Sequence, residues 1–116
     1  MIRDVCRGDI FYYTPFSIDH VQRFKRPAVV VSNDKGNKYS PNVILCTICG
    51  EREKEFVAHV HVRPNKDNGL YKDSVVQCEM IFTVSKNELS DYIGHMDEET
   101  MSKIDEALGI SVGVLI

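Results

Sequence analysis

The sequence lacks any long apolar run, since no stretch reaches the roughly 18 to 20 consecutive apolar residues that a membrane span requires. Its first seven residues also lack the apolar core of a secretion signal. The four cysteines are too few for a disulfide framework in a chain of 116 residues, which can bury a core without one. We therefore expect a cytoplasmic protein with free thiols and no membrane partner.

A strong excess of one charge is also missing. The net charge is −3, which argues against a disordered acidic chain and against a protein that coats nucleic acid unselectively. The charge is nevertheless unevenly distributed, because residues 1–38 hold seven basic and four acidic side chains, whereas residues 85–116 hold two and seven. The first third of the chain is therefore the part expected to meet an anion.

Repeats, low-complexity tracts and linkers rich in Pro, Gly or Ser are absent as well, so we expect one domain over residues 1–116. Short apolar or alternating runs, separated by turn residues, recur along the first three quarters of the chain and predict β-strands. The predicted strands are 10–14, 27–31, 42–49, 56–62 and 74–84, with a turn at 32–37.

The last part of the sequence changes character and predicts helix. Asp97 is suited to cap a helix, and Gly109 is expected to end it. A shorter helix is predicted around residues 87–92, whereas the apolar tail 110–116 fits a strand, a helix extension or a buried interface. Together these elements predict a mainly β (α+β) fold, a small curved antiparallel barrel with its helices late in the chain.

A set of short strings stands in order along the chain: 7–12 (RGDIFY), 26–34 (RPAVVVSND), 36–41 (GNKYSP), 73–76 (DSVV), 97–101 (DEETM) and 103–108 (KIDEAL). In this order and spacing they resemble the MazF/PemK toxins of bacterial toxin-antitoxin pairs. The resemblance implies an SH3-like barrel with a C-terminal helix, a homodimer, and a MazE-like antitoxin as partner. It also implies a metal-independent endoribonuclease, without cofactor, that cleaves single-stranded RNA such as mRNA to 2′,3′-cyclic phosphate and 5′-OH ends.

Cleavage of RNA without a metal requires activation of the ribose 2′-OH, stabilisation of charge on the phosphate, and protonation of the leaving 5′ oxygen. The resemblance assigns the central catalytic role to Arg26, whose planar guanidinium can hold two phosphate oxygens. Pro27 fixes φ where the strand begins and would hold Arg26 at a rigid edge. A solvated arginine beside a strand is the alternative interpretation.

The family also has a threonine near the end of the following strand, whose hydroxyl contacts the scissile phosphate, and an ungapped count from Arg26 leads to Cys49. Because a thiol is a weak donor, we expect this replacement to slow cleavage about ten- to a hundredfold. Thr47 shares a face with Cys49 in a regular strand and is an alternative donor to the RNA. A buried, inert thiol is the other interpretation of Cys49.

A basic loop precedes Arg26. His20 lies where one branch of the family has a histidine proposed as an acid or base, and an imidazole suits proton transfer near neutral pH. Arg23, Phe24 and Lys25 are expected to bind RNA, because cations meet phosphates and an aromatic ring stacks on a base. A plain surface histidine is the alternative for His20.

Glu79 falls where the family often has an acidic residue, so we expect it to position Arg26 or to assist proton transfer. Its alternative is a carboxylate at the barrel rim paired with a basic side chain. Gln77 is expected to contact RNA. Met80 and Phe82 stand where many relatives have Gln and Arg, which makes a catalytically weakened RNA- or partner-binding homologue the alternative function.

Cys46 and Cys49 form a C-x-x-C pattern, and His59 and His61 offer nitrogen ligands, so a zinc site has to be weighed. Residues three apart in a regular strand point to opposite faces, and no second C-x-x-C completes a tetrahedral set. We therefore expect no metal site, with the cysteines as core thiols and the histidines as ordinary strand residues.

Overall fold

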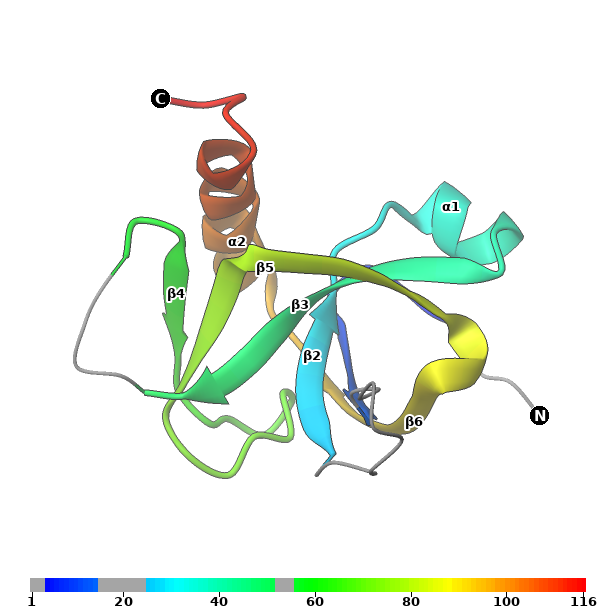
Figure 1. Ribbon diagram of the computed structural model, residues 1–116. Coiled ribbons are helices and arrows are strands. Elements are labelled where there is room, and N and C mark those ends of the chain that lie inside the picture. The colour runs from blue at the N-terminus through cyan, green and yellow to red at the C-terminus, as the bar shows by residue number, and fades with distance from the viewer. Residues whose placement is uncertain (1–3, 15–24, 52–55) are drawn as a thin grey trace, which may run out of the picture.

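The computed structural model describes residues 4–14, 25–51 and 56–116. Within these ranges a six-stranded antiparallel sheet carries one long helix on one of its faces (Figure 1). The strand order across the sheet is β4-β5-β3-β2-β1-β6. The elements in chain order are β1 (Asp9–Tyr13), β2 (Arg26–Val30), α1 (Asp34–Tyr39), β3 (Asn42–Gly50), β4 (His59–Val62), β5 (Ser74–Ser85), η1 (Lys86–Glu88), β6 (Leu89–His95) and α2 (Glu98–Ser111). The predicted mainly β fold with a C-terminal helix is confirmed.

Both faces of the sheet are buried along its middle strands, because consecutive residues point to opposite sides. Ile10 and Val29 enter a core cluster between the sheet and α2, while their neighbours Phe11 and Val30 enter a second cluster on the other face. This explains why the strand around Val29 reads as a continuous apolar run rather than an alternation. The two clusters therefore pack against opposite faces of the sheet and hold it in place.

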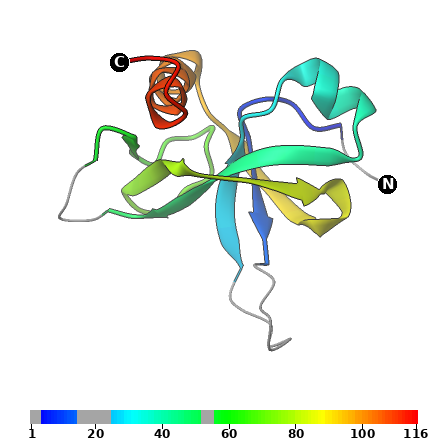
Figure 2. The ribbon, with the colours of Figure 1, turned by 45° about the horizontal axis from the view of Figure 1, so that its top comes forward.

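Helix α2 is anchored by its cap and by one apolar stripe. Asp97 caps it by accepting a hydrogen bond of 2.8 Å from the amide of Thr100, and hydrogen bonds from Thr100 lower the pKa of Asp97. Met101 and Ile104 bury their side chains in the cluster beneath the helix. Figure 2 shows α2 and α1 at separate ends of the molecule. No helix of the described residues is both long enough and apolar enough to cross a membrane.

Gly109 does not end α2, so that prediction is wrong. The helix continues to Ser111, and the tail then turns back so that the amides of Val114 and Leu115 donate to the carbonyl of Gly109. A Cβ at position 109 would lie 2.6 Å from the Leu115 side chain. The glycine therefore makes room for the returning tail, which is a helix extension and a cap rather than a strand.

Two further local predictions are wrong. The turn predicted at 32–37 is largely helix α1, which Asn33 caps by accepting a hydrogen bond of 2.7 Å from the amide of Gly36. The helix predicted around 87–92 is reduced to the 3-10 turn η1, and β6 begins at Leu89. Pairing of β6 with β1, with Phe11 opposite Tyr92, overrides the local preference.

Strand β5 departs from a regular ladder in its middle. Cys46 of β3 pairs with Ile81, and the next residue, Thr47, pairs with Gln77. Cys78, Glu79 and Met80 are thus left without partners in that ladder, which is a bulge in β5. The bulge turns Glu79 and Met80 outward, and both are exposed.

The segment between β4 and β5 is a compact loop built around Asn68. The Asn68 side chain is fully buried, donates to the carbonyl of Arg63 at 2.9 Å and accepts from the amide of Leu70 at 3.0 Å. Gly69 has a φ of +69°, a left-handed conformation that favours glycine, and a Cβ there would lie 1.9 Å from the carbonyl oxygen of Ile93. The loop is therefore held tightly against β6, and residues 70–72 are fixed beside the start of β2.

Candidate active site

Arg26 is the first residue of β2, at the end of the sheet where β1 finishes, and it pairs there with Tyr13. Its side chain is exposed and lines a cavity of about 550 Å³, which lies within the size range of small-ligand sites. We call this the Arg26 cavity. Its described lining residues are Tyr12, Lys25, Arg26, Pro27, Ile48, Cys49, Gly50, Leu70, Tyr71, Lys72, Ser74 and Asp91. The cavity is open to solvent.

Cys49 lines the same cavity from β3. Ala28 of β2 pairs with Thr47 of β3, and continuing that antiparallel register by two residues brings Arg26 opposite Cys49. The thiol is half-buried rather than sealed in the core. The structure therefore brings together the two residues that the resemblance ranks highest.

Cations outnumber carboxylates among the described lining residues. Lys25, Arg26 and Lys72 are cationic, and Asp91 is the single carboxylate there. Asp91 lies 3.5 Å from the ammonium of Lys25, and both side chains are exposed, so the pair is weak. The cavity thus has a net positive character, which favours a phosphate group.

Thr47 and Gln77 are paired across β3 and β5, so the structure brings these two predicted RNA-binding residues together. Thr47 is not among the described residues that line the Arg26 cavity. It lines a second cavity of about 430 Å³, which we call the Glu79 cavity, together with Tyr13, Thr14, Glu79, Met80, Ile81, Phe82, Val84 and Glu88. Thr47 is buried at 6% exposure, which limits its access to a ligand.

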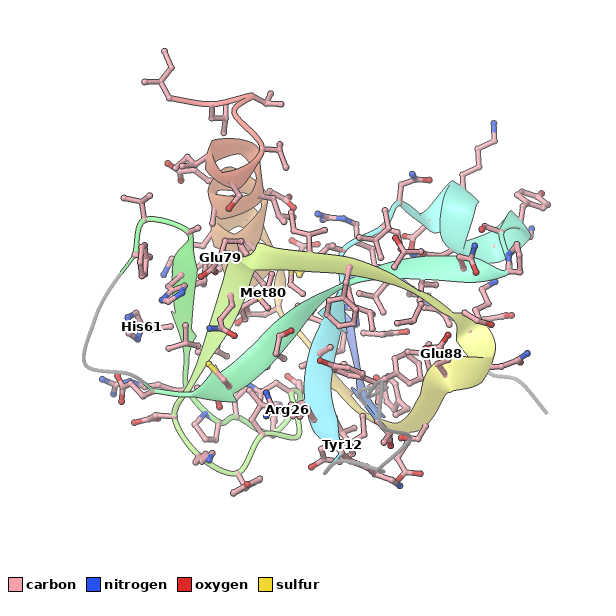
Figure 3. The ribbon with its side chains drawn as sticks, viewed as in Figure 1. Tyr12, Arg26, His61, Glu79, Met80 and Glu88 are labelled. Carbon is pink, nitrogen blue, oxygen red and sulfur yellow. The ribbon has the colours of Figure 1, made fainter. Side chains whose placement is uncertain are left out.

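Glu79 has a partner other than Arg26. Its carboxylate lies 2.9 Å from the Nε2 atom of His59 on β4, whose side chain is 5% exposed. Figure 3 shows Glu79 and Met80 on the upper part of β5, away from Arg26 at the lower end of β2. Of the two interpretations of Glu79, the carboxylate paired with a basic side chain matches this geometry.

Three predicted site residues, His20, Arg23 and Phe24, lie outside the described residues. Lys25 is described and lines the Arg26 cavity beside Arg26 itself. Of the predicted RNA-binding residues in this basic loop, Lys25 is therefore the one that the structure describes at the cavity.

The four residues weighed as zinc ligands are dispersed. Cys46 is buried in the core under α2, whereas Cys49 lines the Arg26 cavity. His59 pairs with Glu79, and His61 lies 3.5 Å from Glu51. A hydrogen bond with Cys78 and burial raise the pKa of the Cys46 thiol. No cluster of three or more potential metal ligands occurs among the described residues.

The comparison with protein families settles the assignment of the chain. A family model described as "PemK-like, MazF-like toxin of type II toxin-antitoxin system" matches residues 6–112. The chain belongs to the PemK/MazF toxin family. Endoribonuclease EndoA of Bacillus subtilis is 39% identical to it over 114 residues, which are 96% of this chain and 97% of that protein.

Two further comparisons agree with the PemK/MazF assignment. Endoribonuclease MazF of Staphylococcus saprophyticus is 39% identical over 90 residues, 77% of this chain and 74% of that protein. A solved structure of an endoribonuclease in complex with its cognate antitoxin, from mycobacterial species, is similar with a TM-score of 0.79 at 25% identity. That similarity covers 97% of this chain and 98% of the solved one.

Among the lining residues of this PemK/MazF toxin that sequence reasoning missed are Tyr71 and Lys72. They belong to the loop built around Asn68, which the sequence shows only as polar and turn-rich. The Asn65, Asn68 and Gly69 run was the available signal, because Asn side chains and glycine build tight turns.

Proposed function

We propose that the chain is the toxin of a type II toxin-antitoxin pair and that it cleaves single-stranded RNA, mRNA included, in the Arg26 cavity. Family membership supports the toxin assignment, and the relatives named endoribonuclease support the reaction. The single observation that carries the site is the pair of Arg26 and Cys49 in one solvent-open, cationic cavity. Such a cavity accepts a backbone phosphate and leaves room for the adjoining ribose.

In the proposed reaction the 2′ oxygen forms a bond to phosphorus while the bond from phosphorus to the 5′ oxygen breaks. The products are a 2′,3′-cyclic phosphate and a 5′-OH. The Arg26 guanidinium donates to two non-bridging oxygens, whose charge grows as the fifth bond forms. A base takes the 2′-OH proton and an acid protonates the 5′ oxygen, and His20 stays our prediction for one of these roles.

Cys49 is the weak point of this proposed site. A thiol donates poorly, so the phosphate receives less stabilisation from this position than a hydroxyl would give. This observation favours one alternative, an RNA- or partner-binding homologue that cleaves slowly. The two candidates share the cavity and differ only in rate.

The proposal includes partners. We expect a homodimer, as the family resemblance implies, and a MazE-like antitoxin, since a mycobacterial relative of the same fold is solved with its cognate antitoxin. Antitoxins of this kind are acidic and partly disordered and fold on binding, which suits a cationic cavity. We further propose that residues 1–116 act as one domain, in the cytoplasm where mRNA is found.

The deciding experiment is cleavage of a mixed-sequence RNA in EDTA, comparing the wild type with Arg26→Ala. We expect 5′-OH products from the wild type and a loss of about a hundredfold or more in the variant, because a bidentate charge-assisted contact disappears. Cleavage that survives in Arg26→Ala would place the chemistry elsewhere. RNA binding without Arg26-dependent products would favour the binding homologue.

A further inference from the structure

Lys72 enters the Arg26 cavity from a part of the fold unrelated to Arg26. It follows the loop built around Asn68, and the hydroxyl of Ser74 donates to its backbone carbonyl at 2.9 Å. The loop is also tied to β6, because the amide of His95 donates to the carbonyl of Asp67 at 2.8 Å. The loop that leads to Lys72 is therefore held by hydrogen bonds to β6 and to the start of β5.

The Lys72 side chain lies across the end of β3. A Cβ added at Gly50 would meet the Lys72 Nζ atom at 3.3 Å and its Cε atom at 3.5 Å. Gly50 directly follows Cys49, so the missing side chain at position 50 lets the ammonium approach the strand end that carries the thiol. The centroid of the Tyr71 ring lies 5.6 Å from Nζ, within cation–π range.

The charge of Lys72 is less compensated than that of Lys25. Asp91, the one carboxylate among the described lining residues, pairs with Lys25. Within the described part of the chain no carboxylate pairs with the ammonium of Lys72. A cation that lines the same cavity as Cys49 and Arg26, and that has no carboxylate partner among the described residues, is suited to bind a phosphate oxygen.

We infer that Lys72 is a second phosphate-binding residue of this site. Its ammonium, which lies near the end of β3, supplies the stabilisation that the Cys49 thiol gives poorly. The inference rests on the proposed function. In the attack of the 2′ oxygen, the non-bridging oxygens gain charge, and an ammonium close to them acts more strongly on the transition state than on the bound RNA. Arg26 contacts the phosphate from the start of β2, and Lys72 contacts it from the loop before β5.

The test compares Lys72→Met with Lys66→Met, a lysine of the same loop that does not line the cavity as described. Cleavage of mixed-sequence RNA in EDTA should fall about 10- to 100-fold in kcat/KM for Lys72→Met, mainly in kcat, and by less than about threefold for Lys66→Met. Lys72→Arg keeps a cation and should recover most of the rate. Equal effects of Lys72→Met and Lys66→Met would overturn the inference.

Gly50→Ala provides a variant in which no charge changes. Its methyl group would displace the ammonium by a few tenths of an ångström, so we expect a smaller loss than in Lys72→Met. In the double variant, the loss should equal that of Lys72→Met alone. Full additivity of the two losses would show that Gly50 acts independently of Lys72 and would contradict the geometry argued above.

A binding measurement separates this inference from the proposed function. Single-stranded DNA of mixed sequence lacks the 2′-OH and is not cleaved, and its affinity falls with salt in proportion to the phosphates contacted, by about 0.7 in logarithmic slope for each. Lys72→Met should lower this slope by about that amount. An unchanged slope refutes the phosphate contact, even in a protein that fails to cleave RNA. A wild type that shows the slope but no Arg26-dependent cleavage refutes the proposed function alone.

Discussion

The Arg26 cavity and the Glu79 cavity draw on the same strand, β3, and differ in their chemistry. Cys49 lines the first and Thr47, two residues earlier, lines the second. Cationic side chains predominate around the first, whereas the second combines apolar side chains such as Phe82 with the carboxylates Glu79 and Glu88. A phosphate is attracted to the first and repelled by the second, so a step of two residues along one strand separates two cavities of opposite charge.

The bulge in β5 is the backbone cause of this separation. Cys46 pairs with Ile81, so in an unbroken ladder Thr47 would pair with the adjacent residue of β5, Met80. It pairs with Gln77 instead, and residues 78–80 of β5 are left without partners in this ladder. Glu79 is one of them, and it turns to His59 on β4 instead of toward β2. We therefore expect the Arg26 cavity to govern the rate of cleavage and the Glu79 region to govern stability.

The largest effect in this comparison, smaller only than that of Arg26→Ala, should come from Arg26→Lys, which keeps the charge and removes the planar fork. We expect kcat to fall about 100-fold with no change in thermal midpoint, because a lysine contacts one phosphate oxygen where arginine holds two and Arg26 is exposed. Single-turnover cleavage and a thermal melt check both parts. A large drop in the melting midpoint would mean that Arg26 supports the fold, and the contrast between the two regions would fail.

Glu79→Ala is the matched change in the second region. The variant should lose about 1 to 3 kcal/mol of unfolding free energy, because the buried His59 ring is left without its acceptor. Urea unfolding measures this loss, and Glu79→Gln, which keeps an acceptor, should lose less. If kcat of the folded Glu79→Gln protein falls more than about tenfold, the earlier interpretation of Glu79 as a catalytic residue is restored and the contrast is broken.

Cys46 provides a test of the buried core under α2. The hydrogen bond with Cys78 and burial raise the pKa of the folded thiol above its ordinary 9.0, so the folded chain keeps a proton that the unfolded chain releases. Its contribution is complete below pH 9.0 and declines as the pH rises, by up to about 1.4 kcal/mol for each pH unit.

Urea midpoints measured between about pH 8 and 11 should therefore decline more steeply in the wild type than in Cys46→Ala. Cys6→Ala removes an exposed thiol and is the control. Identical slopes for all three proteins would show that the core thiol ionises as readily in the folded chain as in the unfolded one.

The sequence predicts the core of this fold better than its site. Continuous apolar runs such as the one around Val29 indicate burial directly, and Asp97 caps α2 as its chemistry predicts. Strand β6 was missed because its pairing with β1 is made with residues about 80 positions away, and no local propensity encodes such a partner.

The candidate active site likewise contains residues that the sequence predicts and residues that it misses. Arg26 and Cys49 follow from the family resemblance and a count along two neighbouring strands. Lys72 could not be found that way, since it reaches the cavity through the turn at Gly69 and the absence of a side chain at Gly50. The position of Glu79 also depends on a three-residue bulge in β5, which cannot be predicted from the sequence pattern of that strand.

The smallest expected effect sharpens the contrast most, because it compares two residues of one strand. Cys49→Thr restores a hydroxyl in the Arg26 cavity, and we expect an unchanged or a faster rate. Thr47→Val removes a hydroxyl from the Glu79 cavity and keeps a side chain of similar size, and it should change kcat by less than about threefold. Single-turnover rates on one RNA measure both. A large loss in Cys49→Thr would show that the thiol has a role of its own, and a large loss in Thr47→Val would move the phosphate contact two residues along β3, into the cavity that repels it.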